Sequence, residues 1–314
     1  MVMLDVFLRW LIRKEIEKLR IRRIMIETTT YCNLRCAGCL RTQSAGWKNQ
    51  HMSVEDYARI IDDLPAMEEL MPQGVGEPTL HPDLLEMIKI ARDSGKFQRI
   101  SFVTNALAKE PSYYDALFDN GLTGLGVSVD SLDQEMASKL RAGTDVAKLK
   151  EALSYLVQHH PGKIVIGMVV GALNWLHVEE TLSQLQEIGH FMVAMHPFDD
   201  MGDGRWCLNL DKKAFFYAGL SGLQRQFPCL NLVAEDFIPS LEVCHAPWEA
   251  PFINVRGGLD PCCRLRLSGF ENVLERTFDA AFHSYLEEEW RERFRKWTPN
   301  CCLDCPFYQV RGKA

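Results

Sequence analysis

The stretch IMIETTTYCNLRCAGCL, residues 24–40, joins a short apolar run to three closely spaced cysteines. The apolar run predicts a β-strand over residues 23–27. Cys32, Cys36 and Cys39 follow it with the spacing C-x3-C-x2-C. Three thiolates on one loop can hold an iron–sulfur cube, whose irons normally take four cysteines. One iron therefore has no protein ligand, and a substrate or cofactor can bind there. The alternative is a zinc site, for which His51 is the only nearby histidine.

Composition narrows the class of protein. The chain has 314 residues, 47% hydrophobic residues and a formal charge of −7, as expected for a globular protein with one large core or with one large and one small domain. The acidic balance argues against a nucleic-acid partner, which requires clustered Lys and Arg. Eleven cysteines without a signal peptide favour metal ligation in the cytoplasm over a disulfide framework. No apolar run approaches the roughly 18 residues of a membrane span.

Residues 1–22 predict a basic amphipathic helix. Apolar residues recur there at helical spacing and alternate with Arg and Lys. We expect its apolar stripe to pack across the base of the barrel described below. The alternative is that the helix lies on an anionic membrane surface, in which case Trp10 would sit at the lipid interface.

Strands and helices alternate over residues 23–198. The predicted strands are 23–27, 69–74, 99–104, 124–129, 163–170 and 191–195. The predicted helices are 54–64, 82–94, 113–120, 134–140, 146–159 and 178–188, with Ser53, Asp133 and Asp145 as caps and Pro82 in a first turn. Six right-handed β/α units predict an α/β fold, a partial (β/α)6 TIM barrel with the cysteine loop on its reaction face.

The alternation stops after Pro197, where a turn-rich segment begins. We expect a connecting helical segment over 199–240, with a helix at 210–226, and a small α+β domain over 241–314. The second domain carries a second cysteine set, with room for a β-hairpin between its first two members: Cys244, Cys262, Cys302 and Cys305. Cys263 and Cys301 are adjacent to predicted ligands and can replace them. Four thiolates can close a cube or hold zinc.

The triplet, the strand before it and the run Gly74-Val75-Gly76-Glu77-Pro78 resemble the radical S-adenosylmethionine (SAM) enzymes. The resemblance implies that SAM chelates the open iron and that one electron from the cluster splits it into methionine and a 5′-deoxyadenosyl radical. That radical then takes a hydrogen atom from the substrate. The second cysteine set resembles the twitch domain, a shortened SPASM domain, which implies one auxiliary cluster. The expected cofactors are thus two 4Fe-4S clusters and SAM.

The same resemblance implies which residues contact SAM. Gly74, Gly76 and Glu77 end the second strand, where small residues let a ligand approach and a carboxylate can accept hydrogen bonds from an ammonium group. The other matching positions end the third and fourth strands or follow the fourth: Asn105, Ser128, Asp130 and Arg141.

One position departs from the family. The residue before the third cysteine is usually bulky or aromatic and packs near adenine, whereas here it is Gly38. Leu40 and Tyr31 are the candidates to compensate. His81, His159, His160 and His196 show no metal-binding spacing, and we expect them to be solvated or structural.

The expected reaction is oxidation of a polyol, sugar or aminocyclitol carbinol, with the auxiliary cluster as electron acceptor. The nearest layout is that of the twitch-bearing dehydrogenases that act on 2-deoxy-scyllo-inosamine. Arg205, Glu242 and the 199–203 loop are candidate polyol contacts. The resemblance also implies an electron donor such as flavodoxin or ferredoxin.

Two alternatives remain. An epimerase or peptide maturase needs a thiol that donates a hydrogen atom, and Cys207 and Cys229 are the candidate catalytic cysteines. The substrate is then an aminoglycoside or a short peptide. The other alternative is a non-catalytic iron–sulfur protein, which does not need Gly76, Glu77 or Ser128 beside the cluster.

Overall fold

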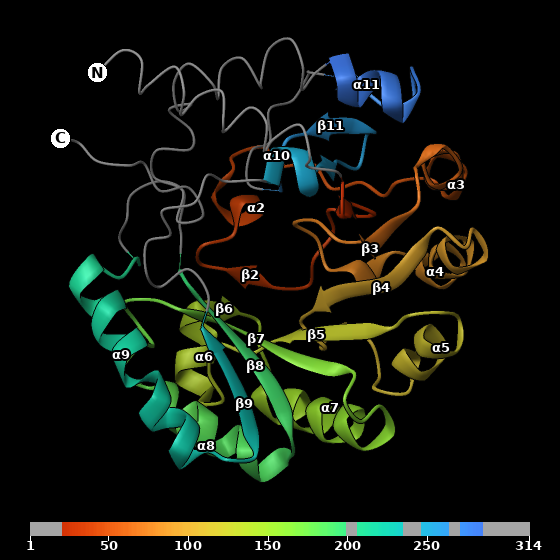
Figure 1. The fold of residues 1–314 in the computed structure, drawn as a ribbon. Coiled ribbons are helices and arrows are strands. Elements are labelled where there is room, and N and C mark those ends of the chain that lie inside the picture. The colour runs from red at the N-terminus through yellow and green to blue at the C-terminus, as the bar shows by residue number, and fades with distance from the viewer. Residues whose placement is uncertain (1–20, 199–205, 235–245, 264–270, 285–314) are drawn as a thin grey trace, which may run out of the picture.

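The computed structural model describes residues 21–198, 206–234, 246–263 and 271–284 (Figure 1). Most of the predicted N-terminal helix over 1–22 lies outside these residues. So do several predicted site residues, namely Cys244, Cys301, Cys302, Cys305, Arg205, Glu242 and the 199–203 loop.

One sheet of ten strands organises the described part of the chain. In spatial order its strands are β12 (Glu271–Asn272), β11 (Gly258–Asp260), β10 (Phe252–Ile253), β1 (Arg23–Ile26), β3 (Met67–Met71), β4 (Phe97–Thr104), β5 (Gly124–Ser128), β7 (Ile164–Val170), β8 (Phe191–Pro197) and β9 (Leu230–Ala234). All pairings from β10 to β9 are parallel, and only β10–β11 and β11–β12 are antiparallel.

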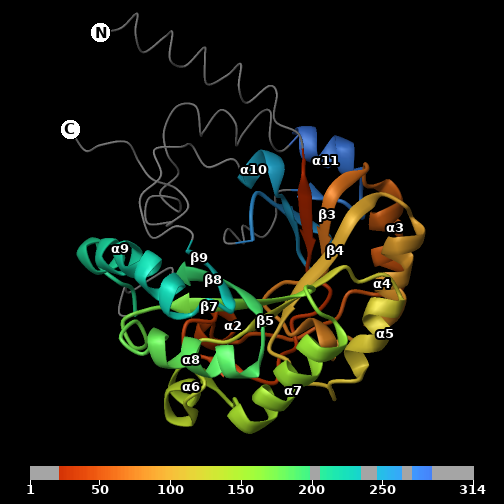
Figure 2. The same ribbon diagram turned by 60° about the horizontal axis from the view of Figure 1, so that its bottom comes forward.

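Helices cover the outer face of this curved sheet, as Figure 2 shows. The main ones are α3 (Val54–Asp63), α4 (Leu84–Asp93), α5 (Tyr113–Asp119), α6 (Gln134–Leu140), α7 (Val146–His159), α8 (Val178–Ile188) and α9 (Leu210–Gln226). Shorter ones are α2 (Leu40–Gln43), the 3-10 helix η1 (Pro78–Leu80), α10 (Ala246–Glu249) and α11 (Phe278–Ser284). The predicted α/β partial barrel is therefore confirmed.

Three of the N-cap residues predicted from the sequence are confirmed. Ser53, Asp133 and Asp145 each accept a backbone hydrogen bond at the N-cap of α3, α6 and α7. The prediction for Pro82 was wrong, because α4 begins at Leu84 and Asp83 takes its N-cap position.

A seventh parallel strand was missed in the sequence. β9 follows α9 and pairs with β8, so strand–helix alternation continues for one unit beyond Pro197. The strand is short, and only Leu230 and Leu232 are buried along it. A turn-rich segment before α9 concealed this weak pattern.

The strands alternate between the packed outer layer and the barrel interior. In β7, for example, Ile164, Ile166, Met168 and Val170 are buried, whereas the residues between them are half-buried. The buried set joins the hydrophobic core beneath the helices. The intervening residues face inward, and at the carboxyl ends of the strands they reach the cavity described next.

No helix in the described ranges combines the length and the apolar character needed to cross a membrane.

Candidate active site

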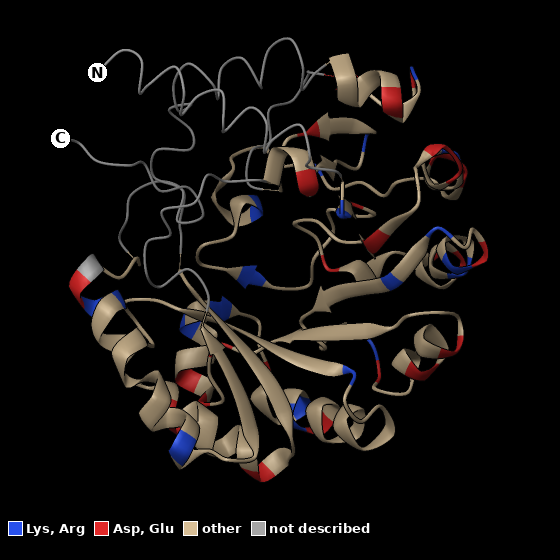
Figure 3. Cartoon of the chain, in the orientation of Figure 1, with Lys and Arg blue, Asp and Glu red and all other residues tan. Residues whose placement is uncertain are grey.

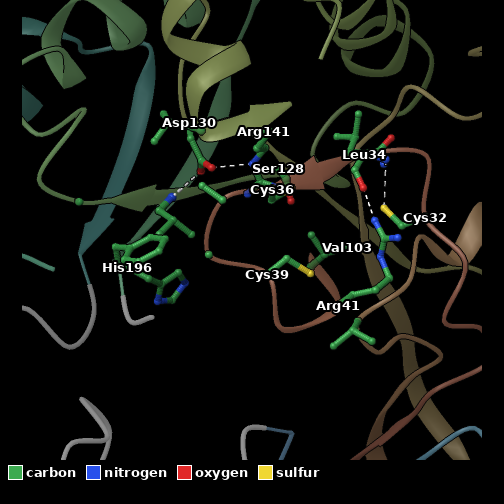
Figure 4. A pocket seen from close by; sticks show the side chains of 18 of the residues that line it. Cys32, Leu34, Cys36, Cys39, Arg41, Val103, Ser128, Asp130, Arg141 and His196 are labelled. Atoms are coloured by element: carbon green, nitrogen blue, oxygen red, sulfur yellow. Dashed lines mark hydrogen bonds and ion pairs between the residues drawn. The ribbon is translucent and has the colours of Figure 1, made fainter. Parts of the chain in front are cut away.

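A cavity of about 660 Å³ opens at the carboxyl ends of the parallel strands (Figure 4). All three cysteines of the triplet line it, and so does every predicted SAM-contacting residue: Gly74, Gly76, Glu77, Asn105, Ser128, Asp130 and Arg141. Residues from five different segments are thus brought together at one place.

The cysteine loop is held by a small sheet of its own. β2 (Arg35–Cys36) pairs antiparallel with β6 (Arg141–Ala142), and Cys36 lies opposite Arg141. The amide of Leu34 donates to Sγ of Cys32 at 3.4 Å, and Arg41 donates to the carbonyl of Leu34. The pairing of β2 with β6 fixes the loop to the segment that carries Arg141, one of the two arginines among the described cavity-lining residues.

The three thiols suit a cluster that binds one thiolate per iron. Burial raises the pKa of Cys32 and raises the pKa of Cys36 to about 11, so binding iron must displace their protons. No three His, Cys, Asp or Glu side chains in the described ranges converge on a single-ion site. The three thiols of the triplet line one cavity, and three thiolates are a donor set that an iron–sulfur cluster can use.

Both glycines of the G-x-G-E run make room for protein atoms. A Cβ on Gly74 would lie 2.7 Å from Cβ of Glu27, and one on Gly76 would lie 2.7 Å from the carbonyl oxygen of Tyr31. The sequence had suggested that these glycines let a ligand approach. In the structure they let the loop after β3 pack directly on the segment that joins β1 to the cysteine loop.

The carboxylate of Glu77 is buried, with 3% of the residue exposed, and it accepts four hydrogen bonds. Oε1 accepts from the amide and hydroxyl of Thr79 and from the hydroxyl of Thr104, while Oε2 accepts from the amide of Asn105 at 2.8 Å. Burial raises its pKa, and the hydrogen bonds oppose that rise. Glu77 therefore ties the loop after β3 to the end of β4.

Asn105 continues this connection toward the cysteines. Its Nδ2 donates to Oδ1 of Asn33 at 2.8 Å, and its own Oδ1 accepts from the amide of Leu107. Asn33 lies inside the cysteine loop, next to Cys32. The end of β4 and the cysteine loop are thus bound to each other by a side-chain pair.

Asp130 orients Arg141. Oδ2 lies 2.5 Å from Nε of Arg141, and Oδ1 accepts from the amide of Val169 at 2.8 Å. Burial by itself would lower the pKa of Arg141, but the neighbouring charges of Asp130 and Cys36 outweigh it and raise the pKa. Arg141 is therefore a fixed cation beside the cavity.

Two further residues of the site were missed. Asn174, which is buried, donates to the carbonyls of Asp130 and Val169 and accepts from the amide of Gly171, so it fixes the loop after β7. Glu27, 1% exposed, accepts from the amides of Val75 at 3.0 Å and Val255 at 3.3 Å. The sequence did offer a signal for Glu27, because a carboxylate placed directly after an apolar strand is typical of a functional or structural polar site.

One pair of the second cysteine set, Cys262 and Cys263, lies among the described residues after a strand pair of the barrel sheet. β10 pairs with β1, β11 pairs with β10, and Pro261 separates β11 from Cys262. Cys263 lines the cavity, whereas Cys262 packs against the hydrophobic core. The two members of this pair thus have different surroundings.

The predicted catalytic cysteines are not brought to the cavity wall. Cys229 is exposed and precedes β9, at the edge of the sheet opposite the cavity. Cys207 is half-buried beside Trp206, which does line the cavity.

The histidines behave in different ways. His81 is buried and pairs with Met52, and His160 pairs with Asp115, which are structural roles. His159 is exposed and stacks on Tyr155. His196 instead lines the cavity, a position that was not predicted (Figure 4).

Leu40 and Tyr31 were the two residues expected to compensate for Gly38. Neither is among the described residues that line the cavity, and Tyr31 stacks on His51.

Comparison with known proteins places this site in a family. The family model for the radical SAM superfamily matches residues 26–185. A GTP 3′,8-cyclase of Chlorobaculum tepidum is 30% identical over 136 residues, which cover 43% of this chain and 40% of that protein. A probable GTP 3′,8-cyclase of Methanococcus maripaludis is 28% identical over 169 residues, 54% of each chain. The match thus spans about half the length of these relatives.

Solved structures share the fold at low identity. SuiB of Streptococcus suis bound to S-adenosylmethionine has a TM-score of 0.70 and 18% identity, covering 94% of this chain and 73% of that one. BtrN in complex with AdoMet and 2-DOIA has a TM-score of 0.54 and 15% identity, covering 88% and 87%.

Proposed function

This chain belongs to the radical SAM superfamily, and on that premise we propose that it oxidises a carbinol carbon of a polyol, sugar or aminocyclitol. In this proposal the second cysteine set, Cys244, Cys262 or Cys263, Cys302 and Cys305, holds an auxiliary 4Fe-4S cluster that accepts an electron. An external donor such as flavodoxin or ferredoxin reduces the first cluster.

The observation that carries the proposal is the position of Cys263. Its side chain lines the same cavity as Cys32, Cys36 and Cys39. Because β11 is joined to β1 through β10, the strand before Cys263 belongs to the barrel sheet. A metal centre held there lies beside the substrate, where an electron acceptor is needed.

The described part of the cavity wall, residues 264–270 and 199–205 being outside it, supports a substrate without phosphate groups. The strands β5, β7, β8 and β9 carry no Lys, Arg, Asp or Glu (Figure 3). Arg41 and Arg141, the cations among the described lining residues, already pair with Leu34 and Asp130. The relatives named for GTP act on a triphosphate, whose charge calls for several cations at once.

When bound, the first cluster and SAM would supply hydrogen-atom abstraction at the carbinol carbon, and a cluster on the second cysteine set would accept the remaining electron. Conversion of the carbinol into a carbonyl would also require the hydroxyl group to lose its proton. The proton needs a base inside the cavity. Glu77 and Asp130 hold their carboxylates in hydrogen bonds, and we assign this role to the imidazole of His196.

The test uses anaerobically reconstituted protein with SAM, dithionite and 2-deoxy-scyllo-inosamine deuterated at its carbinol carbons. A ketone together with deuterated 5′-deoxyadenosine is expected. The double variant Cys302→Ala/Cys305→Ala should keep SAM cleavage and lose the ketone, whereas Cys229→Ala should behave as the wild type. Consumption of GTP in place of the cyclitol would overturn the proposal, and so would solvent deuterium entering an epimerised product.

A further inference from the structure

Phe198 lies where two glycines leave space for it. A Cβ on Gly38 would lie 2.5 Å from Cε2 of the Phe198 ring, and a Cβ on Gly171 would lie 2.9 Å from its Cβ. Carbon atoms in contact stay about 3.5–4.0 Å apart. Neither position can therefore carry a side chain while the ring keeps its place.

The backbone around Phe198 holds the ring there. The amide of Phe198 donates to the carbonyl of Val170 at 2.8 Å, which continues the pairing of β8 with β7 by one residue. On the other side, the amide of Ala172 donates to the carbonyl of Trp206 at 2.7 Å. Gly171 thus sits between two anchored segments, and its Cβ position is also 2.7 Å from the Trp206 carbonyl oxygen.

The ring lines the cavity on the side away from Glu77. Gly74, Gly76 and Glu77 follow β3, whereas Phe198 follows β8, and β4, β5 and β7 separate these strands in the sheet. The aromatic rings among the described lining residues, His196, Phe198 and Trp206, all come from β8 or the segment after it. One end of the cavity is therefore polar backbone, and the other is an aromatic wall beside the cysteine loop.

SAM has a matching division, with a charged amino-acid end and a flat adenine end. We propose that Phe198 is the surface on which the adenine of SAM packs, and that Gly38 is a glycine so that this ring can reach the cysteine loop. The ring thus comes from the end of β8 and not from the loop itself. The proposal concerns the cofactor alone and holds whichever substrate the protein oxidises.

The first test is SAM affinity without reductant, measured by equilibrium dialysis on anaerobically reconstituted protein. Phe198→Ala should weaken SAM binding about 10-fold, because stacking and apolar contact are lost. Methionine, which has the amino-acid end but no adenine, should bind the cluster of this variant as it binds the wild type. Phe215→Ala, at a ring that is 71% exposed, is the matched control and should change neither affinity. Equal losses for SAM and methionine, or no loss for SAM, would overturn the proposal.

The second test moves the ring. Gly38→Phe alone should lower the melting temperature, because its side chain competes with Phe198 for one volume. The double variant Gly38→Phe/Phe198→Ala should regain the melting temperature and most of the SAM affinity that Phe198→Ala lost, with iron content unchanged. A Gly38→Phe variant as stable as the wild type would show that Phe198 does not fill this space, and would refute the assignment.

Discussion

Oδ2 of Asp130 lies 2.5 Å from Nε of Arg141, and the other oxygen of the same carboxylate holds the amide of Val169. The ion pair is mostly shielded, with side-chain exposures of 9% and 20%. Because β6 places Arg141 opposite Cys36, this pair connects the end of β5 to the cysteine loop. We therefore expect loss of this ion pair to lower both the affinity for SAM and the free energy of unfolding.

Asp130→Asn removes the charge that orients Arg141 and leaves a shielded cation without its partner. We expect the variant to bind SAM about 10-fold more weakly and to lose roughly 3 kcal/mol of unfolding free energy. Dialysis with SAM and urea unfolding measure the two effects. Glu135→Gln breaks the exposed pair with Lys139 and should change neither the unfolding free energy measurably nor the SAM affinity. Equal effects of the two variants would contradict this role of Asp130.

Cys39→Ala should remove one cluster and leave the other. If each cysteine set holds a cube, iron per chain falls from about eight to about four, and the SAM-dependent change in the cluster spectrum disappears. Iron and sulfide analysis with electron paramagnetic resonance measures both. Retention of about eight irons would show that Cys39 is not a ligand, and an initial count of about four would show that one set holds no cube.

Gly74→Ala should destabilise the fold, because the new Cβ would lie 2.7 Å from Cβ of the buried Glu27. We expect a loss of about 1–3 kcal/mol in unfolding free energy, as for other overpacked sites. Gly219→Ala is the matched control, since its Cβ would meet no atom within 4 Å apart from the neighbouring backbone of its own helix, α9. That change should stabilise by roughly 0.5–1 kcal/mol through helix propensity. Stabilisation by both variants would contradict the prediction, because it would show that the loop after β3 shifts to accommodate the new Cβ at little cost in free energy.

His81 should make stability depend on pH. Burial lowers its pKa, and its Nδ1 accepts from the amide of Asp83 while Nε2 lies 2.9 Å from the carbonyl oxygen of Met52, which requires a neutral ring. Its contribution is complete above the unfolded pKa of about 6.5 and is lost as the pH falls toward the lower folded pKa.

Urea unfolding at about pH 7.5 and about pH 5.5 measures this loss. The wild type should lose up to about 1 kcal/mol more than His81→Gln on acidification, since one pKa unit corresponds to 1.36 kcal/mol. His190→Gln, at an exposed position, should keep the wild-type dependence. Parallel curves for all three proteins would contradict the prediction.

Much of the site follows from local sequence. The cysteine spacing, the G-x-G-E run and the polar residues after β4 and β5 each end a strand, and parallel strands bring their carboxyl ends to one edge. The roles of the individual residues at that edge do not follow from local sequence. Glu77 and Asn105 use their side chains to join loops, and this depends on partners that lie far away in the sequence, such as Thr104 and Asn33.

By itself, the sequence determined the partial barrel, the helix caps and the convergence of the triplet with the SAM motif, because each rests on periodicity, spacing or a neighbour a few residues away. Only the tertiary structure decided that Cys263 reaches the cavity while Cys262 packs in the core, and that Phe198 fills the space at Gly38. The physical reason is packing. Which of two adjacent side chains faces a cavity, and which distant ring fills a gap, depends on how separate segments pack in three dimensions, and no local pattern records this.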